Sequence, residues 1–417
     1  MPTVAYLTNV FPSPVEPYVM DEIRQLRGRG ITVVPCSARR ASPAADKDLR
    51  AWSDEVLCLE SLHFGLLCRA AYLCITRYKR WKDFCLRALF RKTPAKRRLR
   101  ALLHTFIAIY YAAMLERHHI EHIHVHHGYF ASWVAMVAAA VLNIPFAMTL
   151  HGSDLLIHAA YLDTKLRHCQ FCVTISDFNR RHILKNYPGT DPAKIFVRRM
   201  GVDCEMSIPP PTKSGHSTFR MLTVGRLHPV KDHAFLINGC HLLKKRGLRF
   251  ACSIAGDGPE LLSLEKQICH LGLQQEVQLL GGLSHQQISD EYDEADLIVL
   301  TSRSEGIPLV LMEAMARSKI VLAPAITGIP ELVEDGTTGF LYRPGSLDDF
   351  AARVELITST RSGLTNMRRA ARQRVLCDFN REKNIAAFCD LLISHLQVVP
   401  ARVVPAESHP YENSVLQ

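Results

Sequence analysis

Short apolar runs alternate with segments of helix length along most of the chain, and this alternation limits the possible folds. A buried strand, a helix and another buried strand in succession are typical of a parallel sheet with helices on both faces. The sequence therefore predicts an α/β protein. The expected strands are Val4–Thr8, Ile31–Cys36, His122–Val125, Phe146–Leu150, Phe171–Ile175, Ile195–Arg198, Arg220–Val224, Arg249–Ile254, Val277–Leu280, Leu297–Leu300 and Ile320–Ala323.

The alternation falls into two blocks. Residues 207–218 contain three consecutive prolines and no periodicity, as a linker does. We therefore expect one doubly wound domain over residues 1–206 and another over residues 219–375, a division that suits 417 residues. A helix is expected over residues 376–397, and the tail, residues 398–417, is expected to be disordered. Such sheets bind ligands beyond the carboxyl ends of their strands, so a cleft between the domains is the expected site.

The net charge of +10 is concentrated in one segment. Residues 77–100 hold eleven of the 50 basic residues and one of the 40 acidic residues, so the rest of the chain is neutral. This distribution argues against a general nucleic-acid-binding surface and favours one local contact with an anionic partner. No RNA-binding signature accompanies it.

Read as a helix, the basic segment is amphipathic and belongs to a longer apolar and basic region, residues 60–100. Such a helix is typical of proteins that lie on a membrane surface. A solvated helix packed on the first domain is the alternative. One side of the helix would carry Trp81, Phe84, Cys85 and Ala88, and another Arg80, Arg87 and Arg91.

Cysteine usage and the absence of targeting features indicate a compartment. The thirteen cysteines are scattered, and the single C-x-x-C, Cys169 and Cys172, reads better as two buried residues than as a zinc or redox site. The start of the chain lacks a basic region typical of a secretory signal, and no apolar stretch reaches about 18 residues. We therefore expect a cytoplasmic protein that does not span a membrane.

The loop GRLHPVKD, Gly225–Asp232, follows the first expected strand of the second domain. Gly225 permits a tight turn where the strand ends. Arg226 and Lys231 then place two cations just before a helix, an arrangement that suits a diphosphate. A solvated loop with two surface cations is the alternative.

The segment TSRSEGIPLVLMEAMA, Thr301–Ala316, begins where a later strand ends. Pro308 suits the first turn of a helix, which would leave the amides of Leu309 and Val310 able to bind an anion. Glu305, and Glu313 about one and a half turns into the helix, are suitable partners for sugar or ribose hydroxyls. Two ordinary surface acids are the alternative.

Histidines crowd residues 118–127. His122, His124 and His126 would share one face of a strand buried on both faces, which favours structural histidines over a metal site. Near the carboxyl end of this strand, His126 or His127 could line an acceptor site.

Together these motifs resemble the family 4 glycosyltransferases, which have the GT-B fold. The resemblance is carried by GRL-x-x-x-K at Gly225–Lys231, GDGP at Gly256–Pro259, E-G-x-P-x-x-x-x-E at Glu305–Glu313, and G-I-P-E with DG-x-TG at Gly328–Gly339. In the first half, TNVFPSPVEPYVM, HIHVHHGYF, PFAMTLHGSDL and VTISDFNRR are similar to bacterial exopolysaccharide and colanic-acid-type members. The resemblance covers roughly residues 3–395.

The resemblance implies two Rossmann-like domains facing a cleft, with the C-terminal helix returning to the first domain. It also implies retaining transfer of a sugar from a nucleotide-diphosphate donor, with no metal or other cofactor. The acceptor would be lipid-linked or a saccharide, at the inner face of the membrane, where residues 77–100 would contact anionic lipid rather than nucleic acid. A nucleotide-sugar epimerase of the same fold and a non-catalytic membrane adaptor remain alternatives.

The family pattern also assigns individual residues. Arg226 and Lys231 would neutralise the departing diphosphate, whose charge grows as the bond breaks. The loop Asn9–Pro17 lacks the Gly-Gly pair that many members use near the donor phosphates, which leaves Glu16 as its best polar candidate. The expected catalytic residues are His151, Arg226, Lys231 and Glu305. The expected donor-binding residues are Gly225, Gly256, Gly258, Gly306, Leu309, Val310 and Glu313. The expected acceptor residues are Glu16, His126, His127 and Asp154.

Overall fold

The computed structural model describes most of the chain, namely residues 2–13, 16–41, 47–59, 63–91, 93–204, 218–360 and 363–397. The expected linker lies outside the described residues except for Thr218, and the expected disordered tail lies outside them entirely. Both stay predictions.

The first sheet has seven parallel strands in the order β3-β2-β1-β4-β5-β6-β7. The direction of strand order changes between β1 and β4, so the loops that follow β1, β4 and β5 meet at one edge of the sheet. All six strands expected here are present, and only the two-residue edge strand β3 was not predicted. The strands are β1 (Thr3–Phe11), β2 (Thr32–Arg40), β3 (Leu57–Cys58), β4 (His122–His126), β5 (Phe146–Leu150), β6 (Cys172–Thr174) and β7 (Ile195–Val197).

The second sheet has six parallel strands in the order β10-β9-β8-β11-β12-β13. Its strand order changes direction between β8 and β11, the two strands that precede the candidate donor loops. The five expected strands are present, and β13 was not predicted. The strands are β8 (Phe219–Val224), β9 (Phe250–Ala255), β10 (Val277–Gly281), β11 (Leu297–Val299), β12 (Ile320–Pro324) and β13 (Phe340–Tyr342).

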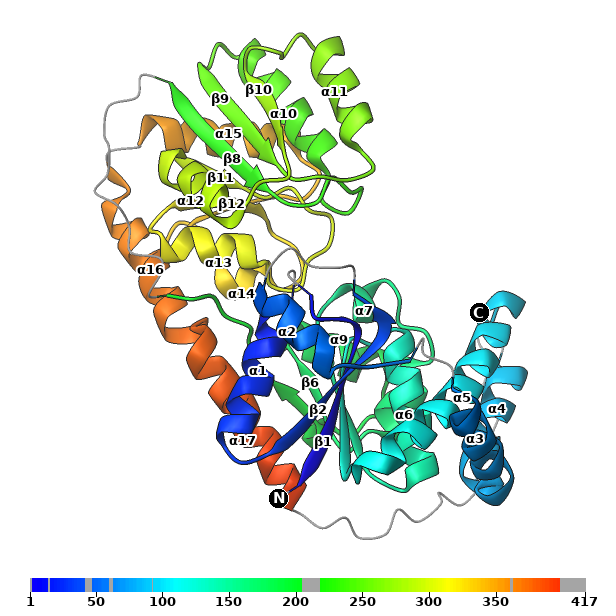
Figure 1. Ribbon diagram of the computed structural model, residues 1–417. Coiled ribbons are helices and arrows are strands. Elements are labelled where there is room, and N and C mark those ends of the chain that lie inside the picture. Colours follow the sequence, from blue (N-terminus) through cyan, green and yellow to red (C-terminus); the bar gives the residue numbers. More distant parts are fainter. Residues whose placement is uncertain are drawn as a thin grey trace.

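Helices cover the faces of both sheets (Figure 1). The helices that follow strands of the first sheet are α1 (Pro17–Gly28), α2 (Lys47–Glu55), α3 (Phe64–Thr76), α4 (Tyr78–Phe90), α5 (Ala95–Leu115), α6 (Phe130–Leu142), α7 (Ser153–Leu156), α8 (Leu162–His168) and α9 (Asp177–Asn186). Those that follow the second sheet's strands are α10 (His233–Lys245), α11 (Leu261–His270), α12 (His285–Glu294), α13 (Leu309–Ala316), α14 (Ile329–Leu332), α15 (Leu347–Ser359), α16 (Thr365–Asp378) and α17 (Arg381–Gln397). Two short 3-10 turns, Glu116–His118 and Pro192–Lys194, are also present.

The last two helices connect the domains. Val375 of α16 is buried in the core of the second domain, whereas Phe388 and Leu392 of α17 are buried with Ile23 of α1 in the first. Figure 1 shows α17 running alongside α1. The predicted α/β class and the return of the C-terminal helix to the first domain are therefore confirmed.

Helices α3, α4 and α5 form a group on the flank of the first domain, beside α6 and away from α1 and α17 (Figure 1). The basic segment is not one helix, since α4 ends at Phe90 and Pro94 caps α5. Trp81 and Phe84 are buried, with edge-to-face contacts to Phe106 and Trp133. The apolar side expected to meet a membrane is therefore turned into the protein, because α5 and α6 offer it an apolar surface.

One helical segment of the described chain, Ala95–His118, is long and apolar enough to cross a bilayer by length and composition. However, 56% of its most apolar window is buried inside the protein. It packs against α6, where the Trp133 indole donates to the Thr105 hydroxyl at 3.0 Å. Core helices pass the same test, so this segment is weak evidence for a membrane span.

Candidate active site

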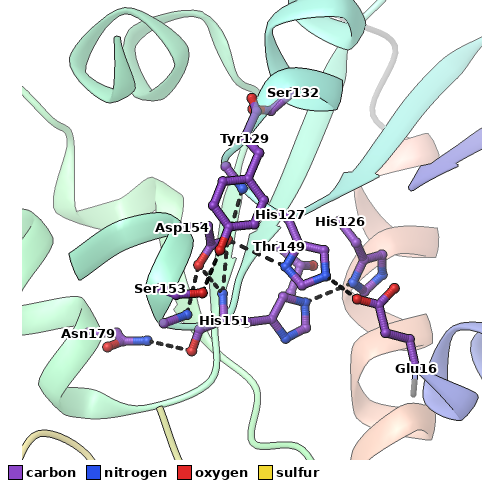
Figure 2. A network of polar contacts seen from close by, with 12 residues as sticks. Glu16, His126, His127, Tyr129, Ser132, Thr149, His151, Ser153, Asp154 and Asn179 are labelled. Carbon is purple, nitrogen blue, oxygen red and sulfur yellow. Dashed lines mark hydrogen bonds and ion pairs between the residues drawn. The ribbon is translucent and has the colours of Figure 1, made fainter. Parts of the chain in front are cut away.

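His151 lies directly after β5, at the edge of the first sheet where the strand order changes. Its Nε2 is 3.0 Å from Nδ1 of His126, and its ring packs against that of Tyr18 at 5.3 Å (Figure 2). Burial, together with the neighbouring His127, His126 and His124, keeps the pKa of His151 well below its usual value. His151 is therefore a neutral imidazole at physiological pH.

Asp154 holds the loop around His151 in place. Its side chain is fully buried, and its two oxygens accept hydrogen bonds from the amides of Gly128 at 2.8 Å, His151 at 3.1 Å and Gly152 at 2.7 Å (Figure 2). Three backbone donors and full burial show that this carboxylate shapes the loop. The predicted contact of Asp154 with the acceptor stays a prediction, and its side chain has no exposed surface in this structure.

His126 is also buried, contrary to its expected place in the acceptor site. Its side chain has no exposed surface, and its Nε2 lies 2.9 Å from Oε2 of Glu22 on α1. Sequence reasoning missed Glu22, although a signal was present. Glu22 is an acid on the face of α1 that also carries Val19 and Ile23, and this face is buried.

Glu16 and His127 form an ion pair at the same edge, with Oε1 and Nε2 2.6 Å apart (Figure 2). Both side chains retain some exposure, so this pair is the part of the expected acceptor set that can meet a ligand. Burial opposes both charges, yet the pairing lowers the pKa of Glu16 and raises the pKa of His127. Asp154, 3.8 Å from His127, contributes to the second shift.

These two shifts predict a pH-dependent contribution to stability. The His127 contribution is complete below its unfolded pKa of about 6.5 and is lost as the pH rises through its raised folded pKa. The Glu16 contribution is present above its unfolded pKa of about 4.3 and is lost as the pH falls through its lowered folded pKa. Glu16→Gln is therefore expected to lower the Tm most near about pH 6 and least at pH values well outside this window. Equal losses of Tm in scanning calorimetry across the whole range would contradict it.

In the second domain, Lys231 and Glu305 are brought into contact. Lys231 Nζ donates to Glu305 Oε1 at 2.6 Å, and the Ser302 hydroxyl donates to the same oxygen at 2.6 Å. The loops after β8 and β11 thus present a paired cation and carboxylate. Arg226, on the same loop as Lys231, is exposed.

The helix α13 begins at Leu309 and not at Pro308, which is its N-cap, and no side chain caps it. The first amides, those of Leu309 and Val310, therefore have no partner within the helix, as the sequence predicted. Glu313 lies one turn further, where Tyr292 donates to its Oε2 at 3.0 Å. Burial raises the pKa of Glu313, and the Tyr292 hydrogen bond and nearby cations oppose that rise.

Two glycine-rich loops lie against each other beside this site. Gly256, with φ +146°, approaches Gly225 so closely that an added Cβ would lie 2.0 Å from the Gly225 carbonyl oxygen. A Cβ at Gly258 would lie 2.3 Å from the carbonyl oxygen of Leu227. Only glycine fits at both positions, and the contact fixes the loop that carries Arg226 and Lys231.

The loops after β5 and β11 meet at what we call the domain junction, the contact between residues 151–152 and 305–306. A Cβ at Gly306 would lie 2.4 Å from the carbonyl oxygen of His151. Close by, Glu331 accepts hydrogen bonds from the amides of Asp177 and Phe178 at the start of α9. The fold therefore brings the expected catalytic residue of the first domain beside those of the second.

Arg226 also lies near the first domain. Burial raises the pKa of the Tyr129 hydroxyl, and Arg226 is among the charges that oppose this rise. Among the described residues, no group of three or more His, Cys, Asp and Glu side chains is arranged to hold a metal ion.

Comparison with known proteins follows the same division into two domains. A model described as "Glycosyltransferase Family 4" matches residues 15–206, and one described as "Glycosyl transferases group 1" matches residues 208–374. The chain belongs to glycosyltransferase family 4. The predicted membership is confirmed, and the protein is a glycosyltransferase.

Relatives within the family include two from bacterial polysaccharide pathways. This glycosyltransferase is 31% identical over 280 residues to the amylovoran biosynthesis glycosyltransferase AmsK of Erwinia amylovora, covering 57% of this chain and 68% of AmsK. It is 33% identical over 201 residues to the putative colanic acid biosynthesis glycosyltransferase WcaL of Salmonella typhimurium, covering 46% of this chain and 50% of WcaL. The second match thus spans half of that relative's length.

Solved structures share the whole two-domain arrangement. A glycosyltransferase from Rickettsia africae has a TM-score of 0.71 at 20% identity, covering 95% of this chain and 99% of that one. Anabaena HepE, in complex with UDP and glucose, has a TM-score of 0.70 at 19% identity, covering 94% of this chain and 100% of HepE. These likenesses confirm the predicted GT-B fold.

Proposed function

We propose that this glycosyltransferase moves a sugar from a nucleotide-diphosphate donor to a lipid-linked or polysaccharide acceptor in exopolysaccharide assembly, with retention of configuration and without a metal. The bond from the anomeric carbon to the diphosphate breaks, and the acceptor hydroxyl passes its proton to the departing diphosphate as it forms the new bond. The nucleoside diphosphate departs with the bonding electrons.

The observation that carries this proposal is the meeting of His151 with the loop of Glu305 at the domain junction. Lys231 and Arg226 provide fixed positive charge on the neighbouring loop, and the α13 amides provide hydrogen-bond donors. Fixed donors and charges favour a transition state in which negative charge grows on the leaving group. Glu313 is suited to the donor ribose, since a carboxylate can accept from two adjacent hydroxyls.

The type of donor and acceptor follows from the relatives. HepE is described in complex with UDP and with UDP-glucose, so a nucleotide sugar is the proposed donor here. AmsK and WcaL are named for amylovoran and colanic acid biosynthesis, so an extracellular polysaccharide or its lipid-linked precursor is the proposed product.

The donor proposal is tested by thermal stabilisation with UDP-, GDP- and ADP-sugars in buffer containing EDTA. A ligand present at about 100 times its Kd should add about 2.7 kcal/mol of stability. We expect one nucleotide class to raise the Tm by several degrees without a metal. No shift with any of them, or a shift that requires a divalent cation, would count against the proposal.

We further propose that the enzyme works on a membrane surface through α3, α4 and α5. Most of the exposed large apolar side chains in the described chain lie on these helices. Single exposed apolar residues are normal on a protein surface, but a concentration of them on one group of helices often marks a site of interaction with a membrane or another protein. These residues are Phe64, Leu67, Tyr72, Ile75, Tyr78, Leu86, Leu89, Phe90, Leu99, Leu103 and Phe106.

Cations accompany the apolar side chains. Lys79, Lys96, Arg97 and Arg100 are exposed on α4 and on the first turns of α5. In contrast, Arg77 and Arg80 both donate to the carbonyl oxygen of Val141, so part of the basic segment serves to hold α4 in place. Exposed apolar and basic side chains together suit the interface of an anionic bilayer, where both find partners.

A further inference from the structure

We propose that Glu22 and His126 are positioning residues that hold His151 with Nε2 protonated, leaving Nδ1 as a hydrogen-bond acceptor for a substrate hydroxyl. This proposal rests on the proposed function only for the identity of the substrate, a sugar. The arrangement of protons is a property of the protein alone.

The geometry is a continuous chain of polar contacts that runs from α1 to the domain junction. Glu22 Oε2 lies 2.9 Å from His126 Nε2, and His126 Nδ1 lies 3.0 Å from His151 Nε2. Tyr6, on β1, donates its hydroxyl proton to Glu22 Oε2, and its oxygen is 2.9 Å from His126 Nε2. Tyr6, Glu22 and His126 are all buried. Buried polar groups need hydrogen-bond partners, so the donors and acceptors of this chain must satisfy one another.

The hydrogen-bonding chemistry of Glu22 limits where the protons of this chain can lie. A carboxylate can only accept, so His126 Nε2 carries a proton and donates it toward Glu22 and the Tyr6 oxygen. The proposal takes the Glu22–His126 pair as a carboxylate and a neutral imidazole, in which the other nitrogen is bare, so that His126 Nδ1 accepts from His151 Nε2. His151 is itself neutral, which leaves Nδ1 without a proton. No donor among the described residues reaches this nitrogen.

Other ionisable groups lie around this chain of polar contacts. The proposed proton positions on His126 and His151 must hold in their presence. A small cavity behind His151 is lined by Tyr18, Glu22, Arg198 and Arg381, among others. The groups nearby are His124 from β4, His127 after it, Glu16 at the N-cap of α1, Tyr18 from α1, Asp154 from α7, Arg381 and Cys389 from α17, and Arg198 and Arg199 after β7.

A histidine that can only accept selects a substrate group that can donate. A sugar hydroxyl meets this requirement, whereas a phosphate oxygen does not. Glu22 and His126 thereby set which kind of substrate group His151 can bind, although neither is proposed to touch the substrate. In metal sites, residues that orient a ligating histidine without touching the metal commonly change activity by about 10- to 100-fold when they are mutated. Glu22 and His126 would orient His151 in the same way.

The first experiment is nitrogen-15 NMR of the wild-type protein with labelled histidine. The nitrogen shifts should show that His126 and His151 are both neutral and both protonated at Nε2 near pH 7. A proton on Nδ1 of His151, or a charged His151, would overturn the proposal whatever the enzyme's activity. Because the readout needs no substrate, a failure of the proposed function would not affect it.

The second experiment compares Glu22→Gln with Glu55→Gln, which removes a half-exposed carboxylate that pairs with Arg27 on the same helix as Glu22. The glutamine amide can donate to His126 Nε2 and so reverse the tautomers. We expect kcat to fall by about 10- to 100-fold with the donor Kd within about threefold, and the His151 nitrogen shifts to exchange. Glu55→Gln should match the wild type. Unchanged shifts in a folded Glu22→Gln protein would overturn the proposal, and if that variant does not fold, the wild-type spectrum still decides.

Discussion

Lys231→Ala is expected to lower the rate of sugar transfer by about 100- to 1000-fold, which is about 2.7–4 kcal/mol of transition-state stabilisation. The Lys231 ammonium is the partner of Glu305 in the ligand-free enzyme, and in the donor complex it would neutralise the departing diphosphate. Because the charge on that group grows as the bond breaks, most of the loss should appear in kcat. Initial rates over a range of donor concentrations measure it.

Matched variants separate catalysis from stability. Lys244 forms a 2.8 Å ion pair with Glu276, away from the candidate site, so Lys244→Ala removes a comparable pair and should leave the rate unchanged. Lys231→Ala also leaves Glu305 without its cation, and Lys231→Gln retains a hydrogen-bond donor while removing the charge. Glu313→Ala should weaken donor binding through the ribose. Wild-type rates in both Lys231→Ala and Glu313→Ala would show that this site does not perform the transfer.

Replacing four exposed apolar residues on the α3–α5 group by serine is expected to abolish binding to lipid vesicles. Phe64, Ile75, Phe90 and Leu99 are 83%, 79%, 81% and 70% exposed. Burying one such side chain is worth about 1.5–3 kcal/mol, so even partial insertion of four corresponds to at least about a thousandfold change in affinity. Vesicle sedimentation measures it. Exposed sites contribute little to folding, so the Tm should change little.

Two controls identify what the surface binds. Leu262 is 69% exposed on α11 of the second domain, and Leu262→Ser should leave vesicle binding unchanged. Changing Lys79, Lys96, Arg97 and Arg100 to glutamine should remove the preference for anionic over neutral lipid, at about 1 kcal/mol per charge. Both multiple variants should lose activity on a membrane-borne acceptor while binding the donor normally. Unchanged vesicle binding by the apolar variant, or a large loss of donor affinity, would contradict the membrane proposal.

The strands were predictable because parallel strands buried on both faces appear as unbroken apolar runs. Phe146–Leu150 has the predicted bounds, and most others differ by at most one residue at either end, although β1 and β2 extend further than predicted, to Phe11 and Arg40. The edge strand β3 is only two residues long, too short for periodicity to reveal. The donor loops were predictable for a related reason, since they directly follow β8 and β11 and their residue types match the family.

The residues around His151 were less predictable because their roles depend on packing between distant segments. Asp154 and His126 have chemistry suited to an acceptor site, yet the fold buries both and satisfies them internally. Glu22 resembles an ordinary acid on α1 until α1 packs against β4 and α17. The amphipathic side of α4 was recognised correctly, but its partner is the interior of the protein. The alternation of polar and apolar residues shows that one face of a helix is buried. It does not show whether the protein interior or another partner buries that face.

The central claim is tested most directly by proton NMR of one reaction, containing the stabilising nucleotide sugar, acceptor-bearing membranes and EDTA. We predict that the donor's anomeric signal is replaced by a glycosidic signal of the same configuration, with one nucleoside diphosphate released per sugar transferred. An altered sugar still attached to its nucleotide would instead identify an epimerase. An inverted anomeric signal, or a reaction that EDTA stops, would contradict retaining transfer without a metal.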